Sequence, residues 1–173
     1  MKVTLFEYPD DRVWLEVKRR ALITVGLRPK TTPDAKWRRN ILAARHSPIR
    51  RLHYGFLIED VPYWVAGHLV RHGHAQPYVG TQRNDRQSKY DRRKAPQDAP
   101  VAMIWDMNGE ELMTVFNKRL CGLAAAEPRE VVQMMLEECK LKSPEIVEFA
   151  VPMCEYHGGV CHEMESCGRC PRA

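Results

Sequence analysis

Apolar residues recur at helical spacing along most of the chain, and two short segments instead have the pattern of a strand. Residues 2–8 alternate in side-chain character and residues 52–59 are rich in aromatic and branched side chains, so we expect a strand at each. Helical spacing and start signals predict helices over residues 10–26, 32–45, 62–73 and 108–123, another from Glu127, and a short one over residues 143–149. Asp10 or Asp11 is expected to cap the first helix, and Pro33 to begin the second. This pattern predicts a helix-dominated α+β fold.

The length and composition of the chain suit one compact domain. It has 173 residues, of which 44% are hydrophobic and 28% charged, and it contains no internal repeat. No apolar run reaches the roughly 18 residues that a membrane span needs. The first residues lack the apolar segment of a secretory signal, because Glu7 and Asp10 interrupt them. We therefore expect a cytoplasmic protein with no membrane partner, with one domain over residues 1–150 and a cysteine-rich tail over residues 151–173.

A cluster of polar side chains follows the helix expected at residues 62–73. Between His68 and Asn84 the cluster contains Arg71, His72, His74, Gln76, Thr81, Gln82 and Arg83. Arginine offers a planar set of donors that fits phosphate, and histidine adds donors, acceptors or a stacking face. The chain has no G-x-G-x-x-G after a strand and no G-x-x-x-x-G-K, so side chains would have to contact any diphosphate. The cluster indicates a site for a phosphorylated, planar ligand, with a solvated basic loop as the alternative.

This cluster resembles the signature R-H-R-x-x-S-x-N-x-x-S-x-R-Y of the flavin-dependent thymidylate synthases. Arg71, His72 and Arg83 match that signature, and Thr81 replaces a serine. The departures are Gly73, Gln76, Tyr78 and Asn84, together with Val79, which stands where many members have a glutamate.

Three further segments carry the same resemblance. The segment leading into the cluster has the F-x-F-x-(I/V) pattern at Tyr54, Phe56 and Ile58, although Arg50-Arg51 replaces the usual Glu-His before it. The helix from Asn108 to Arg119 is similar to the family's N-x-R-x-L-x-x-F-L-x-x-R helix, with Glu110 in place of its arginine. The tail resembles the G-P-x-C…G-x-C-x-E…S-C-G ending of some longer members.

The resemblance implies a single helix-dominated α+β domain with a small antiparallel sheet, assembled as a homotetramer with FAD in a cleft between subunits. It implies methylation of C5 of dUMP, a pyrimidine nucleotide monophosphate, with methylenetetrahydrofolate and NADPH as co-substrates. The residues that would contact the cofactor are Arg71, His72, His74 and Asn108, and those that would contact the nucleotide are His68, Thr81, Arg83 and Arg119. Arg119 would face the pyrimidine ring and stabilise developing negative charge on its carbonyl oxygen. For Asn108 the alternative is a helix N-cap, and for Arg71 it is a surface salt bridge.

Two alternative functions remain open. The departures at Gly73, Gln76, Tyr78 and Val79 would allow another pyrimidine nucleotide or a hydroxymethyl product. The net charge of +5 and the basic residues 83–94 would also suit nucleic acid, but Tyr90 is the one aromatic residue in that stretch, so nucleic acid is a weaker interpretation.

The tail contains four cysteines that are candidate metal ligands. Cys154, Cys161, Cys167 and Cys170 have the spacing C-x6-C-x5-C-x2-C, and the last two form a tight pair that is common in zinc sites. Zinc bound by these four residues is therefore one hypothesis, and reduced cytoplasmic thiols are the other. Cys121 is expected to be a small core residue.

Overall fold

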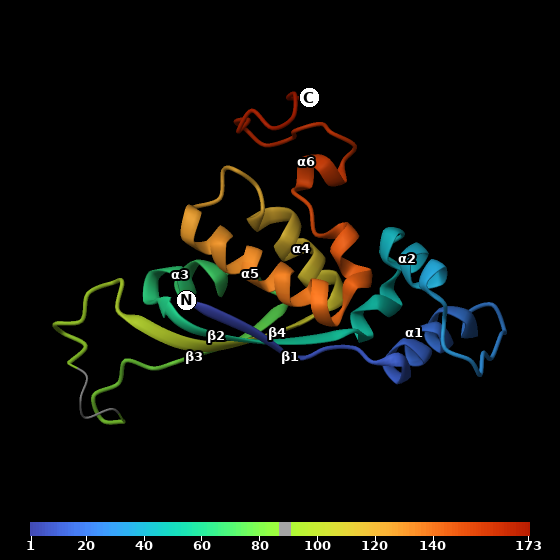
Figure 1. Cartoon of the computed structure of the whole chain (residues 1–173), viewed down its shortest axis with the longest axis horizontal. Helices are drawn as coiled ribbons and strands as arrows, with labels where there is room; N and C mark the ends of the chain where they lie inside the picture. Colours follow the sequence, from blue (N-terminus) through green and yellow to red (C-terminus); the bar gives the residue numbers. More distant parts are fainter. Residues whose placement is uncertain (87–90) are drawn as a thin grey trace.

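A four-stranded antiparallel sheet forms one layer of the protein, and helices form the other (Figure 1). The computed structural model describes residues 1–86 and 91–173. The strands are β1 (Lys2–Glu7), β2 (His53–Pro62), β3 (Ala75–Val79) and β4 (Pro100–Asn108), in the spatial order β1-β2-β4-β3. The expected strands at residues 2–8 and 52–59 are confirmed as β1 and β2, whereas β3 and β4 were not predicted from the hydrophobic pattern. The α+β fold class is confirmed.

The helices follow the expected order, with small changes at their ends. They are α1 (Asp11–Ile23), α2 (Ala35–Ala43), α3 (Tyr63–Leu69), α4 (Gly109–Arg119), α5 (Ala126–Lys142) and α6 (Met153–Tyr156), with 3-10 turns η1 (Ser47–Arg51) and η2 (Pro144–Phe149). Asp10 caps α1, as expected, by accepting a hydrogen bond from the backbone N–H of Val13. The prediction that Pro33 begins α2 was wrong. Asp34 caps this helix, because its side-chain oxygen accepts a hydrogen bond from Trp37 N. The side chain of proline has no oxygen that could accept from this free backbone N–H of the first turn.

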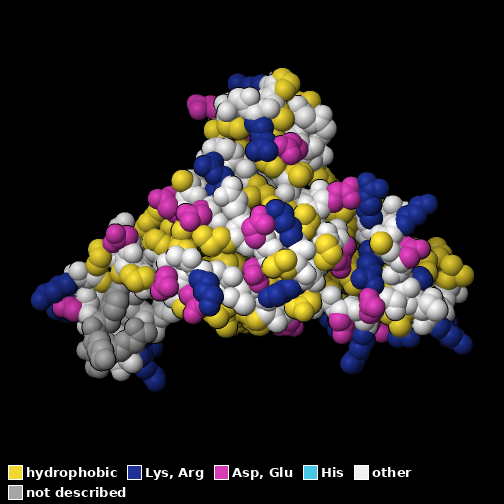
Figure 2. All heavy atoms as spheres, in the orientation of Figure 1, with side chains coloured by type: hydrophobic (Ala, Val, Ile, Leu, Met, Phe, Trp, Pro, Cys, Tyr) yellow, Lys and Arg dark blue, Asp and Glu magenta, His cyan; other side chains and the backbone are white. Residues whose placement is uncertain are grey.

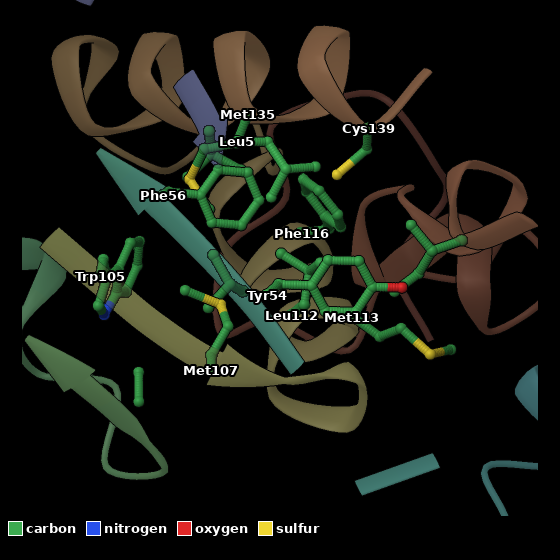
Figure 3. Packing of buried hydrophobic residues seen from close by; sticks show 14 of the residues in the cluster. Leu5, Tyr54, Phe56, Trp105, Met107, Leu112, Met113, Phe116, Met135 and Cys139 are labelled. Carbon is green, nitrogen blue, oxygen red and sulfur yellow. The ribbon is translucent and has the colours of Figure 1, made fainter. Parts of the chain in front are cut away.

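The hydrophobic core lies between one face of the sheet and helices α3, α4 and α5 (Figure 1). Tyr54 and Phe56 of β2 point to this face and are fully buried, as is Phe116 of α4, and Figure 3 shows these rings packed together. The opposite face has exposed apolar side chains at Phe6 and Ile104. Because the helices cover a single face, the C-terminal ends of α3 and α4 both lie over the sheet, which brings the predicted functional residues of both helices together.

The basic stretch after β3 forms a loop in the residues that the structure describes. Residues 82–86 and 91–99 contain turns and no helix or strand. The expectations that concern Lys89 and Tyr90 lie outside the described residues. Within the described chain, no helix combines the length and the apolar composition that a membrane crossing requires.

The cysteine-rich tail folds back on itself beside α4 (Figure 1). It forms a projection from the body of the molecule on the side away from the sheet (Figure 2). Cys161 pairs with Arg172 in an isolated bridge, and its carbonyl accepts a hydrogen bond from Ala173 N at 3.0 Å. Buried Asn117 fixes the start of the tail, because its amide donates to the carbonyl oxygens of Phe149 (3.1 Å) and Val151 (2.7 Å). The tail is thus attached directly to α4.

Candidate active site

Arg119, the last residue of α4, is fixed against the C-terminal end of α3. Its Nε donates a hydrogen bond to His72 Nε2 at 2.9 Å, and its Nη2 donates to the carbonyl oxygen of His68 at 3.0 Å. His68 belongs to the last turn of α3, and His72 lies in the segment that connects α3 to β3. The sequence assigned His72 to the cofactor and His68 and Arg119 to the nucleotide, and the structure brings the three residues together although His72 and Arg119 lie 47 positions apart.

His72 is enclosed on its other sides as well. Its Nδ1 lies 3.4 Å from Oε1 of Glu111, and its ring meets the edge of Trp105 with the centroids 5.8 Å apart. The side chains of His72 and Glu111 are only 9% and 6% exposed. Burial, followed by the positive charge of Arg119, lowers the pKa of His72 to about 4. The imidazole is therefore neutral at pH 7, and one nitrogen accepts while the other carries the proton.

The two charged neighbours of His72 also have shifted pKa values. Burial raises the pKa of Glu111, and the carboxylate of Glu110 adds to this, while His74 opposes it. Burial lowers the pKa of Arg119, and the nearby charge of Arg71 lowers it further. Arg71 and Arg119 therefore lie close enough for their charges to repel, which favours an anionic ligand between or beside them.

A cavity of about 340 Å³ opens next to Arg119. It is lined by Arg71, His72, Lys118, Arg119, Cys121, Leu123, Ala124 and Glu163. Three of these residues are cations, and Lys118 is partly balanced by Glu163, whose Oε1 lies 3.3 Å from Lys118 Nζ. A cationic cavity with a neutral imidazole on its wall can bind an anionic, planar ligand. Glu163 belongs to the tail, so the tail forms part of the cavity wall.

Asn108 and His74 lie nearer to the start of α4. Asn108 is the N-cap of this helix, because its Oδ1 accepts from Glu111 N at 2.9 Å. The N-cap interpretation is therefore confirmed, while a role of Asn108 in cofactor binding stays a prediction. His74 is exposed, and its charge acts on Glu111. In the described part of the chain, neither Asn108 nor His74 lines the cavity next to Arg119.

Thr81 and Arg83 lie in the loop that follows the edge strand β3, and both are exposed. Arg83 forms a bidentate ion pair with Asp85: Nε donates to Oδ1 at 2.9 Å, and Nη2 donates to Oδ2. In the described part of the chain, neither residue lines the cavity next to Arg119. Thr81 and Arg83, which were predicted to contact the phosphate, thus lie outside the cavity beside Arg119, which was predicted to contact the pyrimidine ring.

Two departures from the family pattern contact each other. Arg50, in the position of the family's Glu-His, donates from Nε to the carboxylate of Glu110, which stands in place of the family's arginine. The pair lies at the start of α4, on the side that the resemblance assigns to the flavin. The acidic Glu110 of this chain is therefore compensated by the basic Arg50.

The tail cysteines surround a second cavity, of about 230 Å³. Cys154, Cys161, Cys167 and Cys170 all line it, together with Cys121, His157 and His162, and all six cysteines of the chain are free thiols. Within the described chain, no three histidine, cysteine or acidic side chains are arranged as metal ligands, so the zinc hypothesis stays a prediction. Cys121 is half-buried at this cavity, and the expectation that it is a core residue was wrong.

Three contributors to the site were missed by the sequence analysis: Glu111, Trp105 and Lys118. Glu111 carried a signal, because a glutamate three residues after Asn108 has the spacing of a capping box. That spacing places the carboxyl at the first turn of α4 but does not reveal His72. Trp105 lies in β4, a strand that was not predicted.

Comparisons with known proteins find similarity to one family. The sequence model of the thymidylate synthase complementing protein family matches residues 87–145, which include Asn108 and Arg119. The fold is similar to that of thymidylate synthase X (ThyX) from Helicobacter pylori, in a crystal structure with FAD and dUMP, with a TM-score of 0.66 and 14% identity over 86% of this chain and 96% of that one. A second structure of the H. pylori flavin-dependent enzyme, complexed with FAD and dUMP, gives a TM-score of 0.69 and 14% identity over 87% of this chain and 100% of that one.

No curated protein matches the chain. The matches that do exist agree with each other, because the family model and both solved structures concern the same kind of enzyme. The resemblance to the flavin-dependent thymidylate synthases and the corresponding fold are thereby confirmed.

Proposed function

We propose that this chain, which resembles the flavin-dependent thymidylate synthases in sequence and in fold, is an FAD-dependent enzyme that methylates C5 of dUMP. Methylenetetrahydrofolate would donate the carbon, and NADPH would supply the reducing equivalents. The observation that carries the proposal is the contact between Arg119 and His72 beside a cationic cavity, because it joins two separate parts of the family pattern.

The residues at the site suit a flavin with an anionic diphosphate. Arg71 lines the cavity and is exposed, and among the described residues no side chain pairs with its guanidinium. Together with His72 and the exposed His74 it would contact the diphosphate, and Asn108 would contribute from the start of α4. A bound flavin supplies the redox chemistry that no side chain of the protein can perform. The cavity of about 340 Å³ is small for a whole dinucleotide, which supports a cleft completed by further subunits of a homotetramer.

The nucleotide would be bound by His68, Thr81, Arg83 and Arg119. Arg119 offers a guanidinium whose Nε and one Nη2 proton are already used, so its orientation is set before the ligand arrives. A fixed cation beside the pyrimidine ring stabilises negative charge that develops on a ring carbonyl oxygen. Thr81 and Arg83 would contact the phosphate once the Arg83–Asp85 pair has opened.

Two measurements test this function. The purified protein should absorb near 450 nm (roughly, as expected for a protein-bound flavin) and release FAD on denaturation. Incubation with dUMP, methylenetetrahydrofolate and NADPH should yield dTMP, identified by mass spectrometry. The same spectrum distinguishes a hydroxymethyl product by its extra oxygen. A protein that binds neither FAD nor dUMP, when both are supplied, would refute the proposal.

A further inference from the structure

We propose that Glu111 is a positioning residue that acts through His72 to orient Arg119. This inference rests on the proposed function for its catalytic meaning, but the contacts from Glu111 through His72 to Arg119 are a property of the folded protein. Glu111 occupies the first turn of α4 and Arg119 the last, and His72 from the segment after α3 lies between them. Glu111 is absent from the residues that the family pattern assigns to the site.

The hydrogen bond from Arg119 determines which nitrogen of His72 carries the proton. Arg119 Nε is always a donor, so His72 Nε2, at 2.9 Å, must accept. A neutral imidazole with an unprotonated Nε2 carries its proton on Nδ1. That proton faces Glu111 Oε1, 3.4 Å from Nδ1, which is an acceptor when the carboxyl is ionised. Glu111 therefore stabilises the one neutral form of His72 that can accept from Arg119.

The position of Glu111 leaves it few alternatives. Its backbone N–H is bound by the Asn108 side chain at 2.9 Å, which fixes the first turn of α4. Its side chain is 6% exposed, and among the described residues His72 is its one polar contact. A buried carboxyl without a hydrogen-bonding partner costs free energy, so the His72 contact accounts for the presence of an acid here.

The interposed imidazole also preserves the charge of Arg119. A carboxylate in direct contact with the guanidinium would neutralise much of its field. Here the acid lies one ring away, so Arg119 is oriented by a neutral partner and its positive charge stays available to the ligand. Histidine ligands of metals are commonly oriented in the same way, by an acceptor on the nitrogen that does not bind.

The test compares two substitutions at one position. Glu111→Gln keeps a side-chain oxygen that can accept from His72 Nδ1, whereas Glu111→Leu has a similar shape and no acceptor. With leucine, no acceptor would favour the form of His72 that carries its proton on Nδ1. In the form with the proton on Nε2, that proton would face the N–H donor of Arg119, and the Arg119 side chain would be displaced. Because small misplacements of a catalytic group cost up to about 100-fold in rate, we expect kcat to fall roughly 10- to 100-fold for Glu111→Leu. For Glu111→Gln we expect a loss within about threefold, the size of a single weak polar contact.

A spectroscopic measurement reports the tautomer without any substrate. Two-dimensional NMR of protein labelled with nitrogen-15 in histidine separates the two neutral forms of His72. Wild type and Glu111→Gln should show the proton on Nδ1, and Glu111→Leu should show the Nε2-protonated form or a mixture. The matched control is Glu138→Leu, which removes a partly buried carboxylate that binds Leu5 N (2.9 Å) and Lys142 (2.8 Å), away from the site. It should lower thermal stability and leave both kcat and the His72 tautomer unchanged.

The outcomes separate the two proposals. If wild type shows the Nδ1-protonated form but no turnover of dUMP, the proposed function fails and the role of Glu111 in orienting His72 and Arg119 stands. If Glu111→Leu keeps the wild-type tautomer, the positioning role is refuted, whatever the activity. It is also refuted if Glu111→Gln loses as much kcat as Glu111→Leu. The glutamine side chain keeps an oxygen that can accept from His72 Nδ1, so the positioning role requires it to retain most of the activity.

Discussion

Replacement of Arg119 by alanine should separate catalysis from folding. The substitution removes two hydrogen bonds, from Nε to His72 Nε2 at 2.9 Å and from Nη2 to the His68 carbonyl at 3.0 Å. Each contributes on the order of 0.5–1.5 kcal/mol to stability, so the gross loss is about 1–3 kcal/mol. Part of this is offset, because burial and the charge of Arg71 both disfavour the charged guanidinium. We therefore expect a net loss near the lower end, or a decrease in Tm of a few degrees, at about 2–4 °C per kcal/mol for a domain of this size.

The loss of activity should be much larger than the loss of stability. A fixed donor that stabilises developing charge typically contributes about 10²–10³ in kcat, or roughly 2.7–4 kcal/mol. The assay measures dTMP formation at saturating dUMP, methylenetetrahydrofolate and NADPH, with unfolding followed by circular dichroism on the same samples. Arg129→Ala is a matched control, because Arg129 also donates to backbone carbonyls, those of Gly122 (3.0 Å) and Ala124 (3.4 Å), and does not line the cavity next to Arg119.

Three results would refute the assignment of Arg119 to the pyrimidine ring. Retention of half or more of the wild-type kcat by Arg119→Ala is the first. A decrease in kcat no larger than that of Arg129→Ala is the second, since it would indicate a structural effect. The third is complete unfolding of Arg119→Ala together with normal activity of Arg119→Gln, which lacks the positive charge.

Three further predictions concern the phosphate contact, the buried histidine and the tail. Arg83→Ala should weaken binding of dUMP about ten- to a hundredfold and leave binding of deoxyuridine nearly unchanged, whereas Arg86→Ala, in the same exposed loop, should change neither; equal losses for both ligands would contradict a phosphate contact. Because the folded pKa of His72, about 4, lies below its ordinary value of 6.5, the unfolded chain binds the extra proton first. The free energy of unfolding should therefore fall as pH drops from about 6.5 to 4, by up to about 3 kcal/mol, and a His72→Gln variant should lack this part of the loss unless the assignment is wrong. If Cys154, Cys161, Cys167 and Cys170 bind zinc, protein purified without chelators should contain close to one equivalent by mass spectrometry of metals, and a far smaller content would leave them as free thiols.

The fold was predictable from sequence where burial and periodicity agree, and not elsewhere. Helix α4 was recognised because its apolar residues have helical spacing and its N-cap is asparagine. Strand β3 was missed because Pro77 stands at its centre, and proline usually argues against a strand. The structure explains the exception: β3 lies at the edge of the sheet, where one side of a strand has no neighbour to bind.

Strand β4 was missed for a different reason. Its inward side chains Met103, Trp105 and Met107 are buried, but Ile104 on the outward face is apolar too. The alternation that marks a strand with one buried face is therefore blurred. Since Trp105 forms a wall against His72, the missed strand also concealed one side of the candidate site.

Part of the set of candidate residues could be predicted to lie together from the sequence, but their arrangement could not. The resemblance assigned Arg71 and His72 to the cofactor and Arg119 to the nucleotide, and these three residues line one cavity. Sequence spacing gives no information on which atoms meet across 47 residues, so the pairing of Nε with Nε2 and the part played by Glu111 required the structure. The same holds for Glu163, which reaches the cavity because Asn117 attaches the start of the tail to α4.

The contact between Arg50 and Glu110 changes how the departures from the family pattern should be weighed. Read along the sequence, Arg50 and Glu110 are two independent losses on the flavin side, each of which argues against an active enzyme. In the structure the guanidinium of Arg50 donates to the carboxylate of Glu110, and this contact raises the pKa of Arg50. An acid introduced at the start of a helix is favourable in itself, because it faces the positive end of the helix dipole. The base beside it limits the repulsion that the acid would exert on an anionic cofactor. The two departures are therefore one exchange of charge between neighbouring elements, and together they weigh less against flavin binding than either would alone.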